Sequence, residues 1–322
     1  MALVEPRTPP AKDPLLEQLQ GATRQSVPAF ERGIYAVQHR RYKEAVDELA
    51  AGLDAAPDYV PARVSYARAL YLAGDGETAE RELDRALAAD PNQTLAIFLK
   101  AVLAQQSGDL EQAATLYRRV LAQESDHPGA LFYLANLDLQ SGRYPEAAAG
   151  YRRALQAEQP PPPARMLALI AEHRAGASQS QSAAGLAELI QEHPGDPIPL
   201  YAEACLLAAA RDPKVRDPER ASELVTTLAF QLPGPPQMRA LALAQAANGD
   251  AGGAAKTISQ AIQMSGGWLP PATRAMLDRE LAAYREGRTD DLEPWPAADP
   301  LLSPPPFDPI GPFRDYPANV PY

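Results

Sequence analysis

Small and apolar residues recur along this chain with a fixed period, and polar residues fill the positions between them. Ala45, Ala79, Ala113 and Ala147 stand 34 residues apart, with apolar or aromatic residues at matching positions around each. Two short antiparallel helices stacked on copies of themselves produce such a period, because a small side chain lets neighbouring helices approach closely. The pattern therefore predicts a repeated helix pair.

Turn residues mark the end of each expected helix. Gly74, Gly108 and Gly142 lie where the first helix of a pair must stop, a position that favours left-handed backbone and hence glycine. Arg40 holds the same phase in the first window, so we expect the turn there to be made differently. Prolines close most of the units, because proline cannot continue a helix.

One window carries the pattern most completely, through Leu131, Leu134, Ala135, Gly142, Tyr144, Ala147, Tyr151, Ala154 and Pro160. It resembles the tetratricopeptide repeat (TPR) family, whose signature places glycine and an aromatic residue in the first helix, then alanine, a large apolar residue and a terminal proline. The resemblance implies an all-α, right-handed α-solenoid of about seven TPR-like helix pairs, with a C-terminal capping helix and a proline-rich extended tail.

Five segments are expected along the chain. They are an N-terminal extension (1–25), four well-formed repeats (26–160), degenerate TPR-like repeats (161–269), a capping helix (270–288) and an acidic tail rich in proline and aromatic residues (289–322). A solenoid needs no separate cores, since each repeat buries surface only against its neighbours.

Composition and charge narrow the class of protein. Hydrophobic residues make up 46% of the chain and aromatic residues only 7%, a balance typical of closely packed helices. The formal net charge of −11 argues against nucleic acid as a partner, because phosphate binding depends on Lys and Arg. The longest apolar stretch, Ala204–Ala210, falls far short of the roughly 20 residues that span a bilayer, so no transmembrane segment is expected.

The first residues of the chain bear on its location. Met1–Lys12 contains three prolines and charged residues but no apolar core of a signal peptide. We therefore expect a cytoplasmic protein, or a periplasmic or secreted one if a leader was removed.

Residues that carry chemistry are few and scattered. The four histidines lie far from metal-ligand spacing, and they are His39, His127, His173 and His193. His127 and His193 precede prolines at repeat boundaries and are expected to be polar loop residues. Cys205 lies between apolar neighbours and is expected to be a small core residue rather than a nucleophile. The sequence predicts no enzyme activity, no metal site and no cofactor.

The resemblance also implies a binding face. First helices of successive TPR repeats line a concave groove, and the side chains projected there are Phe30, Ile34, Val64, Arg68, Tyr71, Phe98, Val102, Gln105, Phe132, Tyr133, Asn136 and Gln140. An apolar groove with scattered amides suits an extended peptide or an amphipathic helix of a protein partner. For any single residue, packing in the core is an equally good interpretation of a stripe at helical spacing.

The tail from residue 289 has a different character. It contains ten prolines, six acidic residues and one arginine, which excludes a core of its own. Its aromatic residues favour a recognition segment that docks on this chain or on a second partner, and they are Trp295, Phe307, Phe313, Tyr316 and Tyr322. A solvated linker is the alternative.

Two functional hypotheses follow. The favoured one is a non-enzymatic scaffold or adaptor that binds a partner peptide or helix in its groove and supports assembly of a protein complex. The alternative is a regulatory or accessory subunit of an enzyme complex whose catalytic chain is separate.

Overall fold

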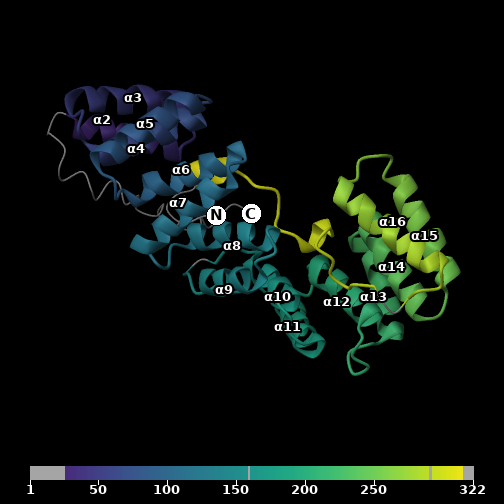
Figure 1. Cartoon of the computed structure of the whole chain (residues 1–322). Coiled ribbons are helices and arrows are strands. Elements are labelled where there is room, and N and C mark those ends of the chain that lie inside the picture. The colour runs from purple at the N-terminus through teal and green to yellow at the C-terminus, as the bar shows by residue number, and fades with distance from the viewer. Residues whose placement is uncertain (1–25, 159, 290–291, 315–322) are drawn as a thin grey trace, which may run out of the picture. The chain divides into compact units, whose positions relative to one another are not determined.

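Seven consecutive helix pairs and one further helix make up most of the part of the chain that the structure describes (Figure 1). This computed structural model describes residues 26–158, 160–289 and 292–314. Over these ranges the backbone forms helices, turns and irregular segments and no strand. The predicted all-α repeat fold is confirmed there, whereas the N-terminal extension 1–25 lies outside the described residues.

The helices of the first four pairs are α2 (Val27–Gln38), α3 (Tyr42–Ala55), α4 (Val60–Leu72), α5 (Gly76–Ala89), α6 (Thr94–Ser107), α7 (Leu110–Gln123), α8 (Pro128–Gln140) and α9 (Tyr144–Ala154). Those of the next three are α10 (Ala164–Arg174), α11 (Gln179–Glu192), α12 (Pro197–Ala209), α13 (Pro218–Gln231), α14 (Pro235–Ala247) and α15 (Ala251–Met264). The chain continues with α16 (Pro271–Arg285), a 3₁₀ turn η2 (Pro300–Leu302) and the short α17 (Ile310–Arg314).

The chain forms two compact units, each described here by itself. Unit 1 comprises Met1–Leu134, Arg153–Pro161 and Phe307–Tyr322, and unit 2 comprises Ala135–Arg152 and Pro162–Pro306. The tail contributes to both. We call residues 292–306, which belong to unit 2, the proximal tail, and residues 307–314, which belong to unit 1, the distal tail. The segment boundaries expected from the sequence stay predictions.

The same turn closes the first helix in several repeats. Left-handed glycines occupy it, with φ between 79° and 103°, at Gly74, Gly108, Gly142, Gly176 and Gly249. In each, the glycine N–H donates a hydrogen bond to the carbonyl of the residue three positions earlier. The N–H of the following residue donates to the carbonyl five positions before it. For Gly108 and Asp109 these distances are 3.2 Å and 2.9 Å. These two hydrogen bonds satisfy carbonyl groups in the last turn of the helix.

Arg40 makes this turn too, so the expectation of a different turn in the first window is wrong. Its φ is 58°. Its N–H donates to Val37 O at 2.9 Å and the Arg41 N–H donates to Ala36 O at 2.8 Å. The helix geometry thus imposes a left-handed backbone on a residue that carries a side chain, which is normally unfavourable.

The periodic alanines lie at the contacts between helices, as predicted. Ala45, Ala79, Ala113 and Ala147 are fully buried. Close approach is also seen at Gly52, where an added Cβ would overlap the ring of Phe30. Small residues at a fixed phase therefore set the spacing of the helix pairs.

Aspartates begin several of the second helices. Their carboxylates accept a hydrogen bond from the backbone N–H three residues on at Asp75 (3.0 Å), Asp109 (3.0 Å), Asp217 (2.9 Å) and Asp250 (2.7 Å). Each satisfies a free N–H of the first turn and complements the helix dipole.

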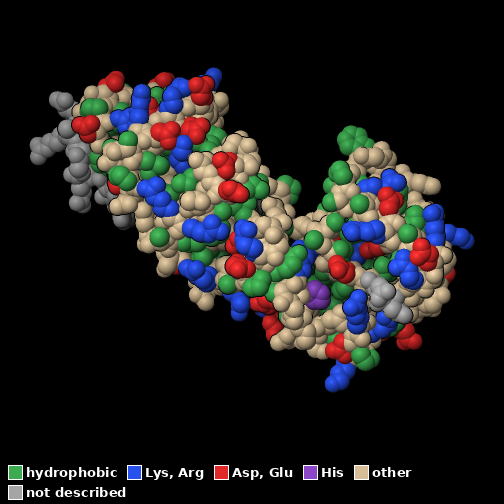
Figure 2. All heavy atoms as spheres, viewed as in Figure 1, with side chains coloured by type: hydrophobic (Ala, Val, Ile, Leu, Met, Phe, Trp, Pro, Cys, Tyr) green, Lys and Arg blue, Asp and Glu red, His purple; other side chains and the backbone are tan. Residues whose placement is uncertain are grey.

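Helix α16 packs on α15 after the last pair and covers its apolar side. Met276, Leu277 and Tyr284 of α16 share a buried cluster with Ala254 and Ile258 of α15. Basic and acidic side chains are interspersed over the face of the molecule drawn in Figure 2. In the described part of the chain, no helix is both long enough and apolar enough to cross a membrane.

Candidate functional site

The distal tail lies on the first helices of unit 1. Helix α17 contacts α4 and α6, as the yellow segment beside α6 in Figure 1 shows. Arg68 of α4 donates from Nε to the backbone carbonyl of Phe313 at 3.0 Å. The Phe313 ring stacks on Tyr71 with centroids 3.9 Å apart and planes at 22°, and it is fully buried. A ring and a carbonyl of the tail are thus both engaged by α4.

A second aromatic anchor lies on α8. The edge of the Phe307 ring meets Tyr133, with centroids 5.5 Å apart and planes at 79°, a favoured geometry for aromatic pairs. Burial and, to a lesser degree, the nearby Asp308 carboxylate raise the pKa of Tyr133. Among the described residues, no acceptor lies within hydrogen-bond range of the buried Tyr133 hydroxyl.

Further aromatic side chains pack against Tyr133 within unit 1. Phe98 of α6 lies between Tyr117 of α7 and His127, with centroids 5.9 Å and 4.7 Å away. Tyr117 stacks on Tyr133 at 5.8 Å and donates its hydroxyl to Gln105 Oε1 at 2.8 Å. We call Arg68, Tyr71 and Tyr133, the residues that touch the distal tail, the tail seat.

Most of the residues projected into the groove from sequence are buried. The buried ones are Phe30, Ile34, Val64, Arg68, Phe98, Val102, Phe132, Tyr133 and Asn136. Phe30 packs against Gly52 and Tyr59 within the core of unit 1, and Asn136 accepts a hydrogen bond from the Tyr151 hydroxyl at 2.7 Å. Core packing, the alternative interpretation of such a stripe, thus applies to residues such as Phe30 and Asn136, whereas Arg68 and Tyr133 also contact the distal tail. The assignment of the twelve residues to a partner-binding groove stays a prediction.

Three of the twelve projected residues are less buried. Tyr71 and Gln105 are half-buried, and Gln140 is exposed. Tyr71 donates its hydroxyl to Gln106 Oε1 at 2.8 Å, which fixes the ring beneath Phe313. Of the tail residues, Tyr316 and Tyr322 lie outside the described part of the chain.

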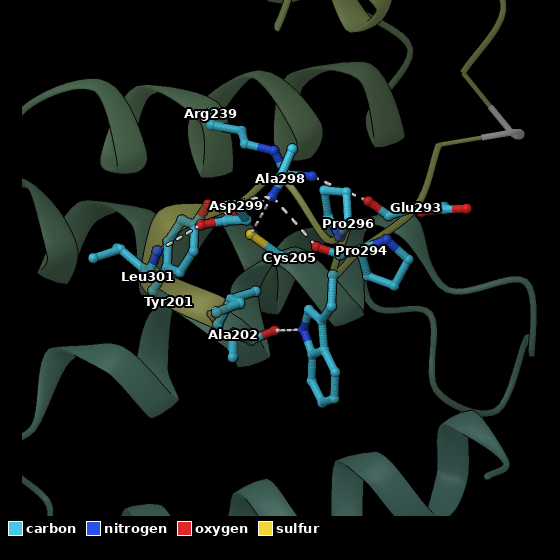
Figure 3. Close-up of polar contacts among 12 residues, drawn as sticks. Tyr201, Ala202, Cys205, Arg239, Glu293, Pro294, Pro296, Ala298, Asp299 and Leu301 are labelled. Carbon is cyan, nitrogen blue, oxygen red and sulfur yellow. Dashed lines mark hydrogen bonds and ion pairs between the residues drawn. The ribbon is translucent and has the colours of Figure 1, made fainter. Parts of the chain in front are cut away.

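Two arginines of unit 2 hold the proximal tail by its backbone. Arg174 at the end of α10 donates from Nη2 to the carbonyls of Pro296 at 3.0 Å and Leu302 at 3.1 Å. The buried Trp295 donates its indole N–H to the carbonyl of Ala202 at 2.9 Å, as drawn in Figure 3. Tail and helices are thus joined in both directions.

Arg239 of α14 is the second of these arginines and is almost completely buried. It donates to the carbonyls of Glu293 (3.0 Å) and Pro294 (3.3 Å) and forms an ion pair with Asp299 (3.1 Å) (Figure 3). It also forms an ion pair with Glu280 (2.8 Å). Burial alone would lower the pKa of Arg239, but the surrounding anionic groups, Glu280 foremost, raise it overall. The guanidinium of Arg239 therefore stays positively charged, and the carboxylates of Glu280 and Asp299 neutralise this charge.

Cys205 belongs to the same cluster and is not a nucleophile. It is fully buried, and burial raises the pKa of its thiol to about 12. Its sulfur lies 3.6 Å from Arg239 Nη1. A thiolate, the reactive form, is thus absent at neutral pH, in keeping with the core role expected from sequence.

The chemistry of the tail explains why arginines hold it. Proline has no N–H, so a proline-rich segment presents carbonyl oxygens with few competing donors. Guanidinium groups offer five donors and no acceptor. Sequence analysis missed Arg174 and Arg239. The available signal was at Arg239, which is followed by the apolar stretch Ala240–Ala244 of α14, whereas Arg174 follows Glu172 and His173 and does not stand out.

Two of the four histidines are exposed, His39 and His193, and two are covered by neighbouring groups. His127 lies in the loop before α8, as expected, but it is buried there, and its Nδ1 accepts the Ala130 N–H at 3.1 Å at the start of α8. His173 Nδ1 lies 2.9 Å from Ser182 Oγ. Within the described ranges, no three His, Cys, Asp or Glu side chains are grouped so that they could hold a metal ion.

Comparison with known proteins relates these features to a family. A family model described as "Tetratricopeptide repeat" matches residues 36–103 and 104–172. A tetratricopeptide repeat protein from Parabacteroides merdae has a TM-score of 0.51 and 18% identity, over 82% of this chain and all of that one. No curated protein matches the sequence.

Two further solved structures are similar at lower scores. YrrB, described as a TPR protein with an unusual peptide-binding site, has a TM-score of 0.46 and 16% identity, over 63% of this chain and 97% of that one. The Naa15/Naa10 structure bound to HypK-THB has a TM-score of 0.47 and 18% identity, over 82% of this chain and 38% of that one. Over residues 36–172, which form repeated helix pairs, the chain thus matches the tetratricopeptide repeat family model.

Proposed function

We propose that this chain is a non-enzymatic scaffold or adaptor that binds a segment of a partner protein on the first helices of unit 1 and supports assembly of a protein complex. The fold supports a protein-binding role, because stacked helix pairs present an extended surface to a partner. Cys205, the one cysteine of the chain, is buried with a raised thiol pKa, and this removes one nucleophile.

One observation carries the proposal. The distal tail already occupies α4 through the ring and the carbonyl of Phe313 and α8 through the Phe307 ring, and α17 also contacts α6. A surface that accommodates a short segment of its own chain has the shape and the hydrogen-bond donors to accommodate one from a partner.

Affinity purification of the tagged full chain from its source cells tests the proposal. We expect at least one protein to be recovered at near-equal amount with the wild type, and to be lost with Tyr71→Ala, which removes the ring under Phe313. Tyr35→Ala is the matched control, because Tyr35 is 53% exposed on α2 and belongs to no part of the tail seat. Equal recovery with Tyr71→Ala and wild type would contradict the proposed surface.

The identity of the recovered protein decides between the two functions. A catalytic chain recovered at a one-to-one ratio favours the alternative, an accessory subunit of an enzyme complex. Partners without catalytic activity favour the scaffold.

A further inference from the structure

The two parts of the tail are held to very different extents. The proximal tail is bound by two arginines, an indole hydrogen bond and the buried Asp299. The contacts that hold the distal tail include a hydrogen bond from Arg68 and two aromatic contacts. Ile310 of the distal tail is exposed and Phe307 is half-buried, and Pro305 and Pro306, which end the proximal tail, are exposed as well. The distal part is therefore the one that can leave its site while the proximal part stays bound.

The resident segment also leaves one group of its site without a partner. Tyr133 is 3% exposed, and its hydroxyl has no acceptor among the described residues. A buried donor without an acceptor is unfavourable. A segment that placed an acceptor near this hydroxyl would therefore gain a hydrogen bond that the distal tail does not make.

We propose that the tail seat exchanges the distal tail for a segment of another protein, and that this segment is proline-rich, carries two aromatic anchors about six residues apart with the second on a short helical turn as in α17, and has an acceptor beside the first anchor. The proposal rests on the proposed function and states the chemistry of the partner. The spacing is that of Phe307 and Phe313, and the acceptor must reach the Tyr133 hydroxyl, which Asp308 beside Phe307 does not.

Each element of this description follows from a contact. Tyr71 and Tyr133 provide the two aromatic surfaces, which require rings in the partner. Arg68 donates to a backbone carbonyl, which requires no particular side chain. Prolines lower the entropy lost when an extended segment is ordered.

A synthetic peptide of residues 304–314 with a fluorescent label is the probe. The full chain with Phe307→Ala and Phe313→Ala has its own anchors removed, and we call it the emptied chain. We expect the peptide to bind the emptied chain with a Kd on the order of 10 µM, measured by fluorescence anisotropy. A tethered segment competes at an effective concentration of about 1 mM, so binding to the wild type should be about 100-fold weaker.

Matched variants identify the site of binding. Tyr71→Ala in the emptied chain should abolish binding, whereas Tyr71→Phe, which keeps the ring, should retain it within about threefold. Tyr133→Phe keeps the second ring and removes the unpartnered hydroxyl, so it should bind at least as well. Ile310→Ala in the wild type leaves both anchors in place and should bind the peptide as weakly as the wild type does. Circular dichroism and urea unfolding establish that each variant is folded.

Several results would overturn the proposal. They are no binding to the folded emptied chain, equal binding to the emptied and wild-type chains, and binding that Tyr71→Ala leaves unchanged. Light scattering at assay concentrations could instead show mixed dimers of the wild-type and emptied chains. A second copy of the chain would then occupy the tail seat, and this result would overturn the proposal too. Peptide binding without any cellular partner would contradict the proposed function alone, whereas a partner lost with Tyr71→Ala despite no peptide binding would contradict only this inference.

Discussion

Arg40 carries a side chain at a turn where five other repeats have glycine in the same hydrogen-bonded conformation. Left-handed backbone costs a residue with a Cβ roughly 1–2 kcal/mol, and the greater freedom of glycine in the unfolded chain offsets part of any gain. We predict that Arg40→Gly raises the free energy of unfolding by about 0.5–1 kcal/mol, measured by urea unfolding.

Gly108→Ala is the reciprocal test of the same turn. An added Cβ at Gly108 meets no atom within 4 Å, so only its left-handed backbone opposes the change. We expect a loss of about 1 kcal/mol. If Arg40→Gly and Gly108→Ala changed the free energy of unfolding by the same amount and in the same direction, the backbone conformation would not control stability at this turn.

Ala147 tests the packing of the repeats. It is fully buried in α9, so Ala147→Leu should overpack the site and lower the free energy of unfolding by about 1–3 kcal/mol. Ala149 lies exposed in the same helix, and Ala149→Leu should leave the urea midpoint nearly unchanged. Similar midpoints for the two variants would mean that this helix face is not a packing surface.

His127 makes the stability depend on pH. Burial lowers the pKa of His127, and its Nδ1 must stay unprotonated to accept the Ala130 N–H. The unfolded chain therefore takes up a proton at a higher pH, near 6.5. His127 thus contributes fully above about pH 6.5, and its contribution is lost as the pH falls below that value. His173, whose pKa burial also lowers, acts with the same sign.

We predict that the urea midpoint decreases between pH 8 and pH 5.5, a window above the ordinary pKa of the carboxylates. His127→Asn should reduce this decrease, because the asparagine oxygen can accept the same N–H without titrating. A variant with the full wild-type pH dependence would assign the effect to other groups.

At the scale of helices, the fold could be predicted because several independent signals agree. The buried alanines, the left-handed glycines and the prolines at unit ends each report helix boundaries or contacts, and the structure places helix pairs where they indicate. The one helix end that differs from expectation is at Arg40, where the turn lies at the predicted position but is made by a residue other than glycine. The hydrogen bonds of the turn hold Arg40 in left-handed backbone although its side chain disfavours that conformation.

The binding face was harder to predict for a physical reason. An apolar stripe at helical spacing arises both from a core and from a groove, and Phe30 and Val102 turned out to be buried. Tyr71 and Tyr133 belong to the tail seat, but nothing in their spacing distinguishes them from the buried members. The contacts of the tail were not predictable at all, because Arg68, Arg174 and Arg239 bind backbone carbonyls.

The distal tail provides a prediction at this scale. Trypsin cleaves after arginine, and Arg314 follows the buried Phe313. We predict that Phe313→Ala accelerates cleavage after Arg314 at least tenfold, because it removes the ring that stacks on Tyr71. Ile310→Ala changes a residue of the same short helix that is 49% exposed, and its cleavage should match the wild type. Equal rates in all three chains would show that this docking does not protect the segment.

At the scale of the whole chain, two truncations separate the roles of the tail. Ending the chain after Pro306 removes the distal tail and the residues after it but keeps the proximal tail, and we expect faster amide hydrogen exchange on α4 and α6 with unchanged exchange in α14 and α16. Ending it after Arg288 also removes Asp299 and the carbonyls around Arg239. Breaking a buried ion pair costs on the order of 3–5 kcal/mol, so α14 and α16 should then exchange faster as well.

This pair of truncations has a clear contrary outcome. If both chains show the same exchange in α14 and α16, the contacts of Arg239 with the tail do not stabilise unit 2. The wild-type chain, measured in parallel, gives the reference for each helix.

Because arginines bind the tail through its backbone carbonyls, the sequence of the tail can change during evolution while these hydrogen bonds remain. A carbonyl is the same whichever side chain stands beside it, so substitutions at Pro296 or Leu302 preserve the acceptors that Arg174 uses, provided the backbone stays extended. Selection should then act mainly on Trp295, Asp299 and Phe313, whose side chains are themselves bound. The intervening positions are free to drift, so descendants of this protein could share the docking mode while their tails look unrelated in sequence.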